Sequence, residues 1–219
     1  LKNNRRGLKA LQNVLKSDPT FFVKLLKAVY RGEGDESREV PEKDKLIAKQ
    51  AYELLHEWKS VPGSMNLEPT KEAFNGDIPF DKGQINEEEL LDWIKKARTL
   101  SEECKRLKIC DSHIGQILAY SPMADDIYWP CEPVCKLIDD FRNEEIENGL
   151  EIGVYNKRGV YWGGKGGELE RRLVEKFQNY ANAIPPKYQR MKRVLTKIAK
   201  SYEHEAEMGD KREAFNEFE

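Results

Sequence analysis

The chain has 219 residues, of which 35% are charged and 39% belong to the hydrophobic set. That length is enough to bury a hydrophobic core in one large domain or two small ones. The formal net charge of −2 provides no general attraction to nucleic acid or to an anionic membrane surface. No apolar run approaches the roughly 20 residues that a membrane-spanning helix needs, and no signal-peptide pattern opens the chain. We therefore expect a cytoplasmic protein that does not associate with a membrane.

Helical periodicity dominates residues 1–60, where apolar side chains recur at the spacing of one helix face. The first helix is expected to end near Ser17. Asp18 is a capping residue and Pro19 fits the first position of a second helix, and a third helix follows a polar loop. Residues 61–84 contain three prolines and three glycines with sparse apolar residues, which predicts a long surface loop.

The central residues, 85–149, are expected to form further helices. Asn86 and Glu89 have the spacing of a capping box at the start of the first of them, which should continue to about Leu107. Gly149 is expected to end the last central helix as its C-terminal cap.

The hydrophobic period changes in residues 150–167. Two short β-prone runs, residues 152–155 and 160–162, flank a four-residue connection and predict a β-hairpin followed by a glycine-rich link. Helical spacing resumes in residues 168–219. The sequence thus predicts a mainly α fold, either an irregular multi-helix bundle or the end domain of a helical array, with one small β-hairpin in one compact domain.

The glycine-rich link raises the question of a phosphate-binding loop. Gly159, Gly164 and Lys165 match the frame G-x-x-x-x-G-K. Gly166 follows, however, where such a loop needs a hydroxyl side chain for Mg²⁺, and no βαβ unit surrounds the motif. We therefore expect a connection between hairpin and helix, in which Lys165 is a candidate contact for an anion.

The residues that bind metals or act as nucleophiles are scattered along the chain. The cysteines are Cys104, Cys110, Cys131 and Cys135. Their spacings lack the C-x₂-C knuckles of zinc sites, although Cys131 and Cys135, one helical turn apart, can either bind metal or simply pack. Glu53 and His56 form one Glu-x-x-His, without the second copy that a di-iron bundle requires. We expect reduced thiols, no metal, no cofactor and no catalytic set.

A basic stripe marks the last long helix. It consists of Arg190, Arg193, Lys197 and Lys200. Residues 187–200 contain six basic residues and no acidic one, and beyond them the balance reverses to seven acidic and two basic residues. The stripe can contact the phosphates of a nucleic acid, or it can face water or pair with acidic segments of its own chain. The second interpretation is favoured, because a net-acidic chain repels nucleic acid elsewhere on its surface.

Aromatic residues outside the regular helices are candidates for a contact surface, together with residues 61–84. These aromatic residues are Tyr128, Trp129, Tyr155, Tyr161 and Trp162. Exposed aromatic rings bury a large area with a small loss of entropy when a partner binds. The alternative is that they pack on the helices of their own domain.

Five phrases of the sequence carry a resemblance that covers nearly the whole chain. They are "DPTFFVKLLKAVYR", "YELLHEWKSVPG", "WPCEPV", "IGVYNKRGVYWGG" and "SYEHEAE". In this order they resemble the C-terminal region of large, mostly uncharacterised bacterial proteins, some of them helical-repeat or NTPase-linked proteins encoded near antiviral defence genes. The resemblance implies a bacterial cytosol and, together with Leu1 in place of Met, a piece of a longer polypeptide. It assigns no catalytic residue.

These observations favour a non-catalytic protein-interaction or scaffold domain, the C-terminal part of a larger bacterial protein. Its partner would be another protein or the remainder of the same polypeptide. The alternative is a nucleic-acid-associated module that uses the basic stripe.

Overall fold

The structure is a computed structural model that describes residues 2–35, 41–68, 77–124, 127–159 and 166–216. The fold is mainly α, as the sequence predicts. The described residues form nine helices, which are α1 (Lys2–Ser17), α2 (Pro19–Val29), α3 (Glu42–Glu57), α4 (Glu87–Glu103), α5 (Leu107–Leu118), α6 (Glu132–Phe141), α7 (Glu144–Arg158), α8 (Glu168–Ala183) and α9 (Gln189–Asn216). Two strands, β1 (Ser64–Glu68) and β2 (Lys82–Ile85), pair antiparallel with Ser64 opposite Ile85.

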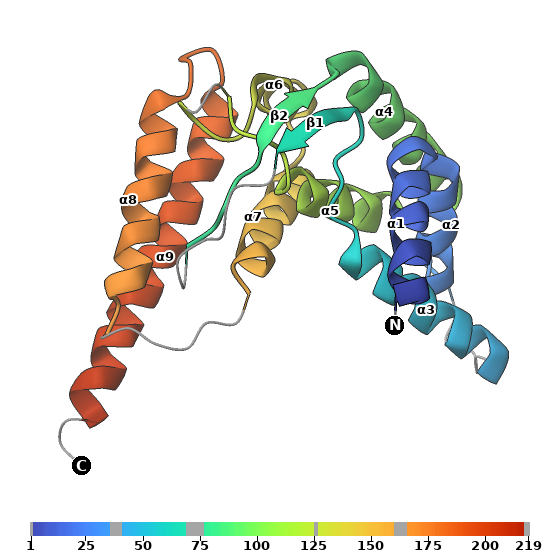
Figure 1. The fold of residues 1–219 in the computed structure, drawn as a ribbon, viewed down its shortest axis with the longest axis horizontal. Helices are drawn as coiled ribbons and strands as arrows, with labels where there is room; N and C mark the ends of the chain where they lie inside the picture. The colour runs from blue at the N-terminus through green and yellow to red at the C-terminus, as the bar shows by residue number, and fades with distance from the viewer. Residues whose placement is uncertain (1, 36–40, 69–76, 125–126, 160–165, 217–219) are drawn as a thin grey trace.

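The helices form three groups along the molecule (Figure 1). Helices α1 to α4 lie at one end and the α8–α9 hairpin at the other, while α5, α6 and α7 lie between them. The strand pair runs beside the central group. The two chain ends lie on opposite sides of the molecule in this view.

Short polar side chains start several of these helices. Asp18 accepts a hydrogen bond from the Thr20 backbone N–H (2.8 Å), with Pro19 in the first position, so the predicted start of α2 is confirmed. The Asn86 side chain accepts from the Glu89 N–H (3.1 Å) at the predicted start of α4. These caps lie within a few residues of the groups that they satisfy, which is why the sequence reveals them.

Helix α4 ends earlier than the sequence predicts. It stops at Glu103 instead of continuing to about Leu107, because Lys105 takes a left-handed backbone conformation with φ of 57°. The Arg106 N–H then bonds the Ser101 carbonyl (2.8 Å), which is the closing hydrogen bond of a Schellman motif. Glycine normally occupies the left-handed position, so a lysine there gives no sequence signal for the end of the helix.

The predicted β-hairpin in residues 150–167 is wrong, since α7 continues through residues 144–158. Residues 160–165 lie outside the described residues. The antiparallel strands are instead β1 and β2. All of β1 and all but the last residue of β2 lie within residues 61–84, where the sequence predicts a long loop. Asn143 explains why α7 forms: its side chain caps the Ile146 N–H (3.0 Å), and acidic residues fill the first turn while basic residues fill the last.

Gly149 does not cap a helix but lies inside α7, where it allows a close approach to α5. A Cβ at Gly149 would lie 2.2 Å from the Ser112 carbonyl oxygen, and one at Gly115 would lie 2.1 Å from the Ile146 oxygen. Gly153, one turn further along α7, shows the same crowding. The two helices therefore pack backbone against backbone, and only glycine fits at these three positions.

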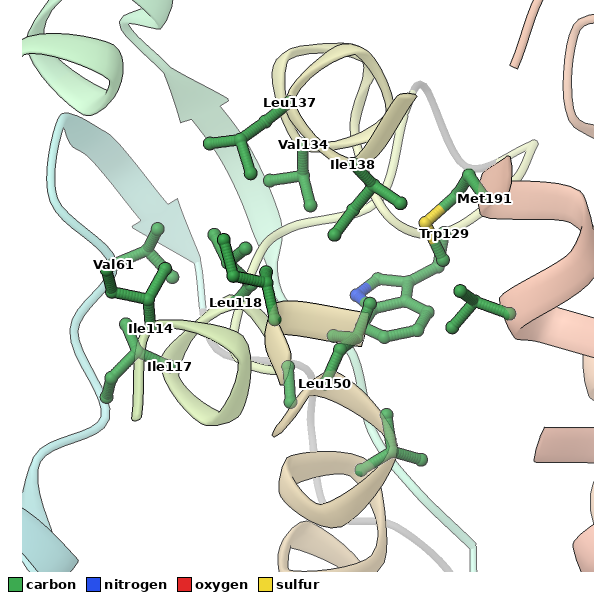
Figure 2. Packing of buried hydrophobic residues seen from close by; sticks show 14 of the residues in the cluster. Val61, Ile114, Ile117, Leu118, Trp129, Val134, Leu137, Ile138, Leu150 and Met191 are labelled. Carbon is green, nitrogen blue, oxygen red and sulfur yellow. The ribbon is translucent and has the colours of Figure 1, made fainter. Parts of the chain in front are cut away.

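A buried aromatic residue connects the central group to the C-terminal hairpin. Trp129 is completely buried, and its indole N–H donates to the Ser121 carbonyl (2.9 Å). Figure 2 shows Trp129 among Ile138, Leu150 and Met191, which belong to α6, α7 and α9. One hydrophobic core thus spans the central helices and α9.

A buried polar cluster joins the central helices. Asp111, which is only 2% exposed, accepts hydrogen bonds from Arg98 Nε (2.8 Å) and from Asn143 Nδ2 (2.8 Å). These three residues belong to α5, to α4 and to the cap of α7. Burial raises the pKa of Asp111, whereas the hydrogen bond from Arg98 lowers it. Asn143 therefore caps α7 and ties it to the buried carboxylate with the same side chain.

Candidate functional site

The structure describes three of the five aromatic residues that the sequence grouped as a contact surface. Trp129 is a core residue and not a contact residue, because its ring fills the space between α6, α7 and α9. Tyr128 is half-buried and packs against the same core. Tyr155 lies on α7 and is 46% exposed. Tyr161 and Trp162 lie outside the described residues.

The candidate anion contacts in the basic stripe are engaged by α7. Arg190 Nε donates to Glu147 Oε1 (2.6 Å), and Arg193 Nη2 donates to Glu147 Oε2 (3.0 Å). Lys197 Nζ lies 2.8 Å from Glu151 Oε2. Three of the four stripe residues thus pair with acidic side chains of the same chain, as one interpretation of the sequence expects.

Two candidate anion contacts remain, Lys200 and Lys165. Lys200 lines a groove between α7 and α9 and forms no ion pair with the described residues. Lys165 lies outside the described part of the chain.

The charge order along α7 explains the charge reversal in α9. At the far end of the two helices the signs exchange: Arg158 of α7 donates to Glu205 of α9 (3.4 Å) and to Glu170 of α8 (2.6 Å). The Arg158 side chain is only 9% exposed, so these partners lie in a partly buried site. We call this row of pairs, from Arg190–Glu147 to Arg158–Glu205, the α7–α9 ion-pair row. It accounts for a sequence feature that could otherwise indicate a nucleic-acid contact.

Three of the four cysteine thiols, those of Cys110, Cys131 and Cys135, are buried and kept protonated by their surroundings. Burial raises the pKa of Cys110 and of Cys131 to about 12, and it raises the pKa of Cys135 as well. All four cysteines are free thiols. Within the described ranges, no three histidine, cysteine or acidic side chains converge as metal ligands would. Protonated, buried thiols are poor nucleophiles, so these three cysteines pack as small apolar side chains.

A cleft of about 360 Å³ lies between the C-terminal end of α3 and the helices α5 and α7. We call it the tyrosine–histidine cleft. Its aromatic lining consists of Tyr30, Tyr52, His56, Trp58, His113 and Tyr120. Ligand sites are typically concave and combine apolar or aromatic walls with a few polar groups, and this hollow has that character.

The inner part of this cleft contains a hydrogen-bonded imidazole and phenol. His113 Nε2 lies 2.9 Å from the Tyr30 hydroxyl, and the two rings are 5.3 Å apart. Burial lowers the pKa of His113 to about 4, so the imidazole is neutral near pH 7. Burial also raises the pKa of Tyr30, and a smaller contribution comes from Tyr52. The pair therefore offers neutral hydrogen-bonding groups and no charge.

The rim of the cleft contains a second aromatic pair. The rings of Tyr52 and His56 are nearly parallel, with centroids 6.0 Å apart, and Tyr52 is 52% exposed. At another part of the lining, burial raises the pKa of Tyr120, and the nearby carboxylate of Glu57 adds to this rise. The Tyr52 ring is thus partly accessible to solvent where it lines the cleft.

Helix α7 also presents one polar and two apolar side chains in a row on its outer surface. Asn148, Ile152 and Tyr155 follow one another at i, i+4 and i+7, and we call them the α7 stripe. Ile152 is 45% exposed, and the Tyr155 ring lies nearly parallel to the Tyr202 ring of α9 at 5.8 Å. Asn148 also lines the groove between α7 and α9, which has a volume of about 480 Å³. The α7 stripe therefore places two exposed apolar side chains, Ile152 and Tyr155, beside a hollow with basic side chains.

Sequence reasoning missed the tyrosine–histidine cleft. Its residues come from α3, α5 and α7 and from the residues that directly follow α2, α3 and α5, so no local motif connects them. The available signal was the placement of His56 and His113 on helix positions next to apolar ones, which by itself is common on helix surfaces.

Comparisons with known proteins add no family to this description. No family model matches the chain, and neither the curated proteins nor the solved structures contain a match. Within the described residues, no helix combines the length and the apolar character needed to cross a membrane.

Proposed function

We propose that this chain is a non-catalytic protein-interaction or scaffold domain whose partner binds along the α7 stripe. The observation that supports this proposal is the exposure of Ile152 and Tyr155, 45% and 46%, side by side on one helix. Protein interfaces commonly combine an apolar or aromatic centre with a polar rim. Here the rim is the α7–α9 ion-pair row.

The chemistry of the groove beside the stripe suggests what the partner presents. Lys192, Lys197 and Lys200 line this groove, and among the described residues Glu151 forms an ion pair with Lys197 but with neither of the other two lysines. A partner with an apolar side chain for Tyr155 and acidic residues beside it would complement both features. The partner is a protein or the remainder of a longer bacterial polypeptide of which this chain is the C-terminal part.

The state of the reactive side chains supports a binding role over a catalytic one. The buried thiols are protonated, because burial raises the pKa of Cys110 and Cys131 to about 12. The imidazole of His113 is engaged by Tyr30 and stays neutral near pH 7. Free thiols one helical turn apart, as in Cys131 and Cys135, also fit a reducing compartment, and we propose a cytoplasmic location.

The test uses a pair of tyrosines with similar exposure. Ile152→Ser/Tyr155→Ala removes the apolar centre of the α7 stripe, whereas Tyr52→Ala removes an equally exposed tyrosine from α3. Each protein, isotope-labelled and immobilised, is used to retain proteins from a bacterial extract, and each retained protein is then purified and titrated. We expect a protein that binds the wild type and Tyr52→Ala, with at least tenfold weaker binding to the double variant.

Equal retention of every protein by the wild type and the double variant would contradict the proposal. Circular dichroism and thermal unfolding verify that both variants remain folded, as is expected for exposed positions. If the wild type itself forms dimers that the double variant does not, the partner is a second copy of this chain, which analytical ultracentrifugation would detect.

A further inference from the structure

The tyrosine–histidine cleft has the size of a site for a small ligand. Its volume of about 360 Å³ falls near the lower end of the range for ligand sites, roughly 300–1,000 Å³. Six aromatic side chains line it, and the exposed ring of Tyr52 stands at its rim. A ligand with one or two flat rings would use these walls better than a flexible chain, because ring stacking needs little loss of conformational freedom.

The charges in the cleft are balanced. Glu57 and Lys59 contribute one negative and one positive side chain to the lining. His113 adds no charge near pH 7 and is held by the Tyr30 hydroxyl at 2.9 Å. An anionic ligand such as a phosphate and a cationic ligand such as a guanidinium would both meet a neutral surface. The charge balance thus favours a ligand without net charge.

The polar groups in the cleft both donate and accept hydrogen bonds. Gln116 and Asn156 each provide an amide with an N–H₂ donor and a carbonyl acceptor, and both line the cleft. The hydroxyl of Tyr120 and the Tyr30–His113 pair add groups that can do either. A ligand whose edges carry donors and acceptors in the plane of a ring would satisfy them.

We propose that the tyrosine–histidine cleft binds a neutral, planar heteroaromatic ligand of the nucleobase or nucleoside class, stacked on Tyr52 and hydrogen-bonded by Gln116 and Asn156. Aromatic stacking together with amide hydrogen bonds is the usual chemistry of base recognition by proteins. Gly153 and Asn156 of α7 line the cleft, whereas Ile152 and Tyr155 are not part of its lining. The proposal therefore does not depend on the α7 stripe or on a protein partner.

The test is a titration of the whole chain with the neutral nucleosides adenosine, guanosine, cytidine and uridine. Binding is followed by calorimetry and by the fluorescence of the tryptophans, one of which, Trp58, lines the cleft. We expect saturable one-to-one binding of at least one nucleoside with a dissociation constant below about 1 mM. Tyr52→Ala should weaken that binding by about fivefold to 150-fold, the usual effect of removing a stacked ring.

Two further variants separate the site from general effects. Gln116→Leu keeps a similar volume but removes the amide, and it should weaken binding by about tenfold. Tyr155→Ala removes an exposed tyrosine outside the cleft and should leave the dissociation constant unchanged. Nucleoside binding should thus depend on Tyr52 and not on Tyr155, whereas binding of the protein partner should depend on Tyr155 and not on Tyr52. Each proposal can therefore be refuted without the other.

Three results would overturn the assignment. The first is the absence of binding by all four nucleosides at about 1 mM. The second is binding that persists unchanged in Tyr52→Ala and Gln116→Leu. The third is a preference for a charged ligand or for an amino-acid side chain over a neutral nucleoside. It would appear as at least tenfold tighter binding of adenosine monophosphate than of adenosine, or as tighter binding of argininamide or tyrosinamide than of every nucleoside.

Discussion

Replacing Gly149 by alanine should separate α5 from α7. The new Cβ would lie 2.2 Å from the Ser112 carbonyl oxygen, and real Cβ atoms essentially never approach another atom closer than 3.0 Å. The obstacle is backbone, so the helices must move apart by most of an ångström. Overpacking of this kind costs about 3 kcal/mol, and the better helix propensity of alanine returns about 1 kcal/mol. We expect a net loss of about 2 kcal/mol in the free energy of unfolding.

Urea and thermal unfolding followed by circular dichroism would measure this change. For a domain of this size a loss of about 2 kcal/mol lowers the melting temperature by about 4–8 °C. Asn148→Ala, at the neighbouring exposed position of α7, is the matched control and should change stability by less than about 0.5 kcal/mol. Gly149→Ala with equal or higher stability than the wild type would refute the backbone contact, because only the helix-propensity gain would then remain.

Three other changes have expected outcomes. Asn143→Ala removes the cap of α7 and one hydrogen bond to buried Asp111, so it should cost about 2–3 kcal/mol in urea unfolding, whereas exposed Asn156→Ala should cost less than about 0.5 kcal/mol. Burial lowers the pKa of His113 from 6.5 to about 4. Between these values only the unfolded chain binds the proton, so stability should fall by up to about 3 kcal/mol as the pH drops through this window, and His113→Gln should show a smaller fall. The protein should not shift the mobility of DNA or RNA at low salt, because acidic side chains of α7 already pair with the basic stripe. A mobility shift that weakens steeply with added salt would contradict this prediction.

The parts of the fold that the sequence predicts correctly depend on local chemistry. Asp18 and Asn86 bond backbone groups two and three residues away, so their meaning is visible in the sequence. The helical periodicity of α2 and α9 likewise reflects one face of each helix packing on the core.

The region around α7 shows where local preference fails. Ile152, Val154 and Tyr155 favour strands, yet they continue a helix because Gly149 and Gly153 let α7 pack closely against α5. The sequence did contain a sign of this helix: an asparagine cap, acidic residues in the first turn and basic residues in the last. Each of these signals is weak by itself. The contact with α5 that favours the helix over a strand involves residues more than 30 positions away in the sequence.

The two candidate binding regions differ in how far the sequence could predict them. Tyr155 was identified from the sequence as a contact residue, although on the assumption of a strand, and its exposure on α7 keeps it available. The cleft residues Tyr30, His56 and His113 come together only through helix packing, which no periodicity within one helix encodes.

The reversal of sign in the α7–α9 ion-pair row restricts how the α8–α9 hairpin can dock. The hydrophobic effect is non-directional, so apolar contacts define the axial position of a helix less sharply than ion pairs do. A one-turn slide of α9 along α7 would place Ser201 or Gly209, in place of Glu205, opposite the guanidinium of Arg158. The partly buried guanidinium of Arg158 would then lose its carboxylate partners, which is strongly destabilising. Apolar packing therefore attaches the α8–α9 hairpin to the central helices, and the ion-pair row fixes its position along α7.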